Sequence, residues 1–193
     1  MSDENGTPTM DDFFNEAVNQ AEVEETLQRG LLPNGTYTTN PDEFGPMTVT
    51  PLNVEEKDDR GTVTGTRRVI VLSGRGRAKV KIKDPKTGQV NLESAEGQIR
   101  ARLSPDSRNK RDWTTKEELN APDSATALYA QAVKAYQQTF GERPKNVGQV
   151  LEYLRDHPAK FRVIQIGVPT ERNPQPDGEP RNHVMGIYAQ GRG

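Results

Sequence analysis

Apolar residues recur along this chain with two different periods, and each period predicts one kind of secondary structure. Spacings of three and four residues put the apolar side chains of residues 9–29 on one side of a helix, opposite an acidic side. The same spacing predicts a helix over 123–140 and a shorter one over 146–156, which ends at His157-Pro158. Three helices are therefore expected, one near the N-terminus and two in the second half of the chain.

Alternation with a period of two, together with runs rich in Val, Ile and Thr, predicts the strands. Turn signals separate them, among them a bend at Ser73-Gly74. Residues 104–122 are rich in polar and turn-forming residues and are expected to form a polar linker. After a turn at 31–37, the predicted strands cover 47–54, 62–72, 75–83, 98–103, 161–168 and 182–189.

The order of these elements indicates a protein that is mostly β with helices. A run of strands with two helices inserted before the last strands fits a small antiparallel barrel of the oligonucleotide-binding type, preceded here by the N-terminal amphipathic helix. A plain α+β sandwich is the alternative. The predicted domains are an acidic N-terminal arm, 1–30, and a single β-barrel domain, 31–193, with a helical insertion at 123–156.

Charge is distributed much less evenly than the net charge of -2 suggests. Residues 1–28 contain eight acidic residues and no Lys or Arg, so the remainder carries 26 basic against 20 acidic residues. Within 67–111, thirteen basic residues stand against four acidic ones. A basic segment joined to an acidic tail is typical of nucleic-acid-binding proteins, whose cations follow the phosphate backbone.

The strongest binding signal is a basic residue at every second position of the predicted strand 75–83. Because a strand places alternate side chains on opposite faces, all five cations are expected on one face and Val80 and Ile82 on the other. Aligned like charges repel one another, so such a row favours a surface for a polyanion over a stabilising role. The alternatives are a solvated outer face and an edge strand that lysines protect from aggregation. The five residues are Arg75, Arg77, Lys79, Lys81 and Lys83.

Further basic and aromatic residues extend this candidate nucleic-acid-binding surface. Arg100 and Arg102 alternate with apolar residues in a strand expected to pair with the first, which would place them on the same basic face. The linker contributes Arg108, Lys110, Arg111 and Trp113. The tryptophan is expected either to stack on a base or to fill an apolar space under a loop. The weaker aromatic candidates, which the core would equally accommodate, are Tyr37, Phe44 and Tyr188.

Catalysis and metal binding have little support in this chain. The absence of cysteine excludes disulfides, thiolate metal sites and a thiol nucleophile. The two histidines, His157 and His183, are far apart in sequence and lack carboxylates at metal-binding spacing. No Gly-rich phosphate-binding loop leads into a helix. We therefore expect a protein that is not an enzyme and that holds neither a metal nor a cofactor.

Three segments frame the predicted domain: Pro33-Asn34-Gly35-Thr36-Tyr37, Phe161-Arg162-Val163-Ile164-Gln165 and Asn182-His183-Val184-Met185. With the strands, polar stretch and helices between them, they resemble phage-encoded single-stranded DNA-binding proteins, small oligonucleotide-binding-fold proteins of phage replication and recombination. The resemblance covers about residues 31–189. It implies a barrel, sequence-tolerant binding of single strands and no catalysis. Members of that family commonly carry an acidic tail at the C-terminus, whereas the acidic segment here is N-terminal.

The segment Asp11-Asp12-Phe13-Phe14 places acidic residues beside phenylalanines. It resembles the acidic, Phe-bearing tips by which single-strand binders recruit replication or recombination proteins or shield their own groove. The alternative is an ordinary amphipathic helix whose apolar side packs on the barrel or on a second copy in a homo-oligomer.

The sequence thus predicts a sequence-tolerant single-stranded DNA-binding protein of phage-type DNA replication or recombination, with single-stranded DNA as its partner. One alternative is a structural adaptor or tail component of a phage particle. Another is an RNA-binding accessory protein, because the contacts that distinguish RNA from DNA are local. The chain contains no apolar run of membrane-spanning length, and its N-terminus is acidic. No membrane partner is expected, and the expected location is the cytoplasm of the host cell.

Overall fold

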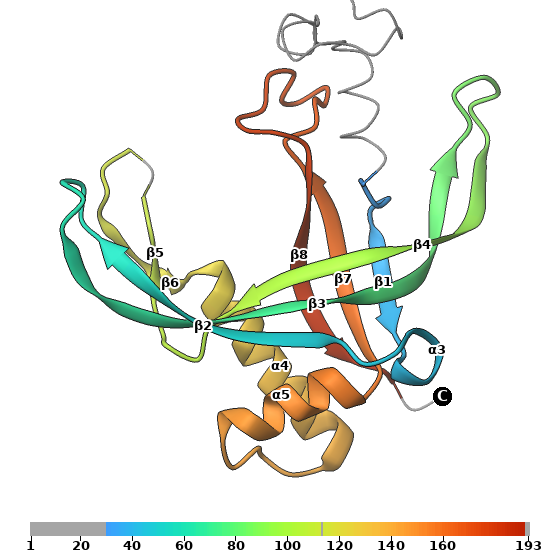
Figure 1. Cartoon of the computed structure of the whole chain (residues 1–193). Helices are drawn as coiled ribbons and strands as arrows, with labels where there is room; N and C mark the ends of the chain where they lie inside the picture. Colours follow the sequence, from blue (N-terminus) through green and yellow to red (C-terminus); the bar gives the residue numbers. More distant parts are fainter. Residues whose placement is uncertain (1–29, 113, 192–193) are drawn as a thin grey trace, which may run out of the picture. The chain divides into compact units, whose positions relative to one another are not determined.

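The computed structural model describes residues 30–112 and 114–191. The chain divides into two units, 1–31 and 32–193, and all helices and strands of the described residues belong to the second unit. The predicted N-terminal helix, 9–29, and Trp113 lie outside the described residues. In chain order the elements are β1 (Gly35–Thr39), α3 (Pro41–Phe44), β2 (Thr48–Lys57), β3 (Val63–Lys83), β4 (Val90–Leu103), β5 (Asn109–Arg111), β6 (Glu118–Pro122), α4 (Ser124–Phe140), α5 (Val147–Asp156), β7 (Ala159–Ile166) and β8 (Arg181–Ala189) (Figure 1).

Antiparallel pairing joins six strands into one curled sheet, which confirms the prediction of a mostly β protein with helices. β4 pairs along one edge of β3, whereas β2 and then β1 pair along the opposite edge. β1 also pairs with β7, and β7 pairs with β8. The short hairpin β5–β6 is a separate sheet. The long strand β3 is therefore the element on which the rest of the sheet is assembled.

The two ends of the sheet meet along a seam between β4 and β8. These strands lie against one another but are not hydrogen-bonded neighbours in the sheet. Helix α4 packs on both strands, and the Gln131 side-chain oxygen accepts a hydrogen bond from the backbone N–H of Ile187 at 2.8 Å. The helix thus supplies a partner for an N–H group of β8 that strand pairing would otherwise satisfy.

The hydrophobic core lies between the inner face of the sheet and helices α4 and α5. Both helices begin and end as predicted from the sequence: Asp123 and Asn146 accept hydrogen bonds from backbone N–H groups of the first turns, and Gly141 ends α4 in the left-handed conformation. The largest fully buried side chains include Tyr37, Leu72, Ile99, Leu103, Val150, Tyr153, Leu154, Phe161, Val163 and Ile187. No helix of the described residues is both long and apolar enough to cross a membrane.

Three predictions about the strands are wrong. The expected bend at Ser73-Gly74 is absent, and β3 runs unbroken from Val63 to Lys83. Gly74 instead provides space for the side chain of Met47. A Cβ at this position would lie 2.8 Å from the Met47 Cγ, a distance that real Cβ atoms essentially never show. The second predicted basic strand begins at Val90 rather than at 98, and the predicted linker contains the hairpin β5–β6.

Candidate nucleic-acid interface

The basic residues of β3 and β4 share one face of the sheet, which we call the basic face. The alternation predicted for 75–83 is confirmed, with the five cations exposed and the residues between them buried or partly buried. The strand register sets Arg100 opposite Ser73 and Arg102 opposite Val71, so both arginines lie on the same face as the row. They continue the row end to end instead of lying beside it. The basic face comprises Arg75, Arg77, Lys79, Lys81, Lys83, Arg100 and Arg102.

The far end of the β3–β4 hairpin forms an arm that Figure 1 shows extending beyond β1. Lys79, Lys81 and Lys83, the arm lysines, are exposed on its basic face, and none forms an ion pair with another described residue. Leu92 and Val90 lie opposite Lys81 and Lys83, and they are 63% and 59% exposed. A polyanion on this arm would meet cations along one strand and apolar side chains along the next.

The middle of the basic face carries ion pairs. Arg75 Nη2 and Arg77 Nη2 each lie 3.0 Å from an oxygen of Glu96. Arg77 also pairs with Glu43 of α3, and its guanidinium carbon lies 5.3 Å from the ring centre of Phe44. The hydrogen bond to Glu96, followed by the charge of Glu43, raises the pKa of Arg77. These two predicted binding residues are therefore partly neutralised in the free protein.

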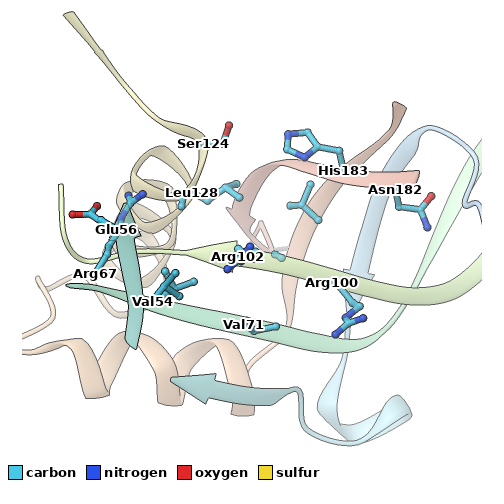
Figure 2. Close-up of a pocket in the computed structure, with 14 residues that line it drawn as sticks. Val54, Glu56, Arg67, Val71, Arg100, Arg102, Ser124, Leu128, Asn182 and His183 are labelled. Atoms are coloured by element: carbon cyan, nitrogen blue, oxygen red, sulfur yellow. The ribbon is translucent and has the colours of Figure 1, made fainter. Parts of the chain in front are cut away.

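At the other end of the basic face lies a cavity of about 770 Å³ (Figure 2). Residues of β2, β3, β4, β8 and the first turns of α4 line it. Arg100 and Arg102 are exposed at this cavity, and neither has an ion-pair partner within the described part of the chain. The cavity therefore joins unpaired cations to apolar surface. Its aliphatic lining comprises Val54, Val69, Val71, Ala101, Ala125, Leu128 and Val184.

Arg67, which the sequence analysis did not select, fixes the α4 side of this cavity. Its guanidinium donates to both carboxylate oxygens of Asp123, at 2.6 and 3.0 Å, and to the Ser104 and Thr126 hydroxyls at 3.0 and 2.9 Å. A fifth hydrogen bond reaches the backbone oxygen of Asp106. Burial alone would raise the pKa of Asp123, but the hydrogen bonds from Arg67 and Thr126 outweigh burial and lower it. The pair ties β3 to the N-terminus of α4.

His183 of β8 also lines the cavity, as Figure 2 shows. Burial, helped by the nearby positive charge of Arg181, lowers the pKa of His183 and so favours the neutral form of the ring. From the sequence, His183 was a candidate for catalysis and metal binding and part of the segment Asn182-His183-Val184-Met185, but it was not predicted to be a nucleic-acid-binding residue. Among the described residues, no group of three or more His, Asp or Glu side chains could hold a metal ion.

One residue of the predicted linker cluster, Arg108, contacts the lining of the cavity through Glu56. Arg108 donates two hydrogen bonds to the carboxylate of Glu56, at 2.9 and 3.0 Å, and these lower the pKa of Glu56. Lys110 and Arg111 are exposed on β5, where Arg111 pairs in register with Glu118. The alternatives for Trp113 stay open, because this residue lies outside the described residues.

The weaker aromatic candidates fall into three different environments. Tyr37 is fully buried, and its hydroxyl donates to the Pro33 carbonyl oxygen at 2.8 Å, so it belongs to the core. Phe44 contacts Arg77, and Tyr188 is exposed on β8. None of the three lines the cavity. Apart from the ring of His183, the apolar contacts to bases in the cavity would therefore be made by aliphatic side chains.

No protein-family model matches this chain, and the search of curated proteins gives no match either.

Proposed function

We propose that this protein is a sequence-tolerant single-stranded DNA-binding protein built on an oligonucleotide-binding-type barrel. The observation that carries the proposal is the basic face, which has unpaired cations at both ends: the arm lysines at one end, and Arg100 and Arg102 beside a cavity with an aliphatic lining at the other. Cations bind the phosphates of any sequence, and counterion release makes that binding strong at low salt. Aliphatic side chains offer no hydrogen-bond code, so contacts between them and bases tolerate every sequence.

The strand order supports the barrel. If β1 and β2, which pair along one edge of β3, are taken as one interrupted strand, the order around the sheet becomes β1/β2, β3, β4, β8, β7 and back to β1. This order is the one expected of a five-stranded, partly open barrel, with α4 and α5 between β4 and β7, the third and fourth strands in chain order. Such barrels bind oligonucleotides on the face of the second and third strands, flanked by the first hairpin loop and the loop before the last strand. In this chain those strands are β3 and β4, which carry the basic face.

Single strands fit this surface better than duplexes do. In a duplex the flat faces of the bases are stacked on one another, and a protein meets phosphates and groove edges. An unpaired strand turns its bases outward, so they reach an apolar cavity while Arg100 and Arg102 bind the backbone. Replication and recombination of phage-type DNA is the setting that we propose for this binding.

One observation favours the structural alternative, a component of a phage particle. Val90 and Leu92 are exposed on the arm, and exposed aliphatic side chains also suit contact with another protein. The two functions differ in their need for nucleic acid, since a structural component requires no affinity for a single strand.

The test is fluorescence anisotropy with a labelled oligothymidylate of about 20 nucleotides, longer than the roughly 4–16 that one such barrel covers. A duplex of equal length is the control. We expect tighter binding of the single strand and a steep loss of affinity between about 50 and 200 mM salt. Equal affinity for the duplex, or no binding at low salt, would favour the structural alternative.

A further inference from the structure

Two arginines of the basic face already hold an anionic group. Arg75 Nη2 lies 3.0 Å from Glu96 Oε1, and Arg77 Nη2 lies 3.0 Å from Glu96 Oε2. One carboxylate therefore bridges two guanidinium groups that stand two residues apart on β3. Carboxylates and phosphodiesters both present anionic oxygens to which guanidinium N–H groups donate. The spacing that suits the carboxylate of Glu96 also suits a backbone phosphate.

Glu96 occupies a decisive position along the basic face. It lies opposite Arg77 in the register, between the arm lysines on one side and Arg100 and Arg102 on the other. All residues of β3 and β4 are described, and Glu96 is the one acidic side chain that these strands place on this face. A polyanion that follows the face from the arm to the cavity must pass this carboxylate.

We propose that Arg75 and Arg77 form a phosphodiester-binding site in which Glu96 takes the place of the phosphate in the free protein and leaves when a strand binds. The identity of the polyanion rests on the proposed single-strand binding, whereas the site itself rests on the contacts of Glu96. A bound phosphate replaces both ion pairs of Glu96, and the released carboxylate becomes hydrated.

Two features keep the free-energy cost of replacing Glu96 by a phosphate low. The side chains of Arg75 and Arg77 are 58% and 47% exposed, and ion pairs exposed to this extent contribute little to stability. Arg77 also stays oriented after Glu96 leaves, because its Nη1 pairs with Glu43 and its guanidinium lies over the ring of Phe44. The site thus retains a positioned guanidinium for the incoming phosphate.

The informative variant is Glu96→Gln, with Glu93→Gln as its matched control. Both substitutions remove one negative charge from β4, but Glu93 lies opposite Val80 on the other face of the strand. A general electrostatic gain would appear in both variants. Loss of a competitor for Arg75 and Arg77 would appear only in Glu96→Gln. Circular dichroism of each variant checks that the fold is unchanged.

The first measurement uses no nucleic acid. Tripolyphosphate is titrated into the wild type and both variants while NMR follows the side-chain Nε–Hε signals of Arg75 and Arg77. We expect these two signals to respond, and to respond at lower tripolyphosphate concentration in Glu96→Gln than in Glu93→Gln. If the signals do not move in Glu96→Gln, the anion site does not exist and the proposal is overturned.

The second measurement uses the labelled oligothymidylate. Glu96→Gln is expected to bind about fivefold more tightly at low salt, the scale of one exposed ion pair removed. The salt slope should steepen by up to about 0.7, the value for the one phosphate that Arg75 and Arg77 bind together. Equal gains in both variants, or weaker binding by Glu96→Gln, overturn the proposal. If even the wild type fails to bind the oligonucleotide, the proposed function fails, and the tripolyphosphate titration alone decides whether the anion site exists.

Discussion

The ion pair between Arg67 and Asp123 is expected to hold α4 against β3, and Arg67→Met tests this. The side chains of the pair are 14% and 26% exposed, and Arg67 makes five hydrogen bonds. Removing one partner of a buried ion pair costs about 3–5 kcal/mol. Because this pair is partly solvated, we expect Arg67→Met to lower the free energy of unfolding by about 2–3 kcal/mol. Urea unfolding followed by circular dichroism measures the change.

The adjacent arginine is the matched control. Arg68 also binds a carboxylate with two side-chain nitrogens, that of Asp106, but its side chain is 61% exposed. Arg68→Met should therefore cost at most about 1 kcal/mol. In Asp123→Asn the amide oxygen can still accept from Thr126 N, so the helix cap survives while the charge is lost. Combining Arg67→Met with Asp123→Asn should reveal a coupling free energy of about 1–3 kcal/mol.

The same pair sets a pH dependence of stability. The pKa of Asp123 is lowered in the folded protein, so its contribution is fully present above about pH 4 and is lost as the pH falls through the lower folded value. Asp123→Asn should flatten the stability curve in this acidic window. If Arg67→Met lowers the free energy of unfolding no more than Arg68→Met does, the pair of Arg67 and Asp123 does not anchor α4 on β3.

Three further predictions concern binding of the oligothymidylate. Changing all three arm lysines to Ala should flatten the salt slope by about two, near 0.7 for each lost phosphate contact, without unfolding the protein; an unchanged slope would mean that the arm binds no phosphate. Burial lowers the pKa of His183, so its protonation at a pH below the ordinary histidine range adds positive charge at the cavity; affinity should rise there on acidification, and His183→Asn should reduce that rise. Deleting residues 1–28 changes the net charge from -2 to +6. Affinity for the oligothymidylate should therefore rise, and most in dilute buffer, because salt screens charges beyond about 10 Å at 0.1 M. A loss of folding or of an oligomer, measured by melting temperature and light scattering, would instead assign this segment a structural role.

Local periodicity was sufficient to predict part of this site. The two-residue alternation of 75–83 fixes which side chains share a face regardless of the rest of the fold, and the structure has that alternation. For the same reason, the sequence predicted that Arg100 and Arg102 lie on one face of their strand. The residues of β3 that lie opposite these arginines could not be predicted. The register of β4 on β3 is set over the whole hairpin, and residues 90–97 lack a clear alternation of apolar and polar residues.

The remaining features depend on residues far apart in sequence. Glu96 joins Arg75 and Arg77 through the register, and the cavity combines side chains from five elements between Val54 and Val184. The partly buried position of Arg67 also had no sequence signal, because its partner Asp123 is 56 residues away. At Gly74 the sequence predicted a feature that the structure lacks. The glycine is typical of a bend, but here it leaves room for the side chain of Met47.

The most direct test of the proposed function is the affinity of the wild-type protein for the oligothymidylate and for a duplex of equal length across one salt series. Binding at the basic face predicts a clear preference for the single strand and an affinity that falls steeply and log-linearly with salt. Equal binding of both nucleic acids, or no binding of the single strand at low salt, would contradict it.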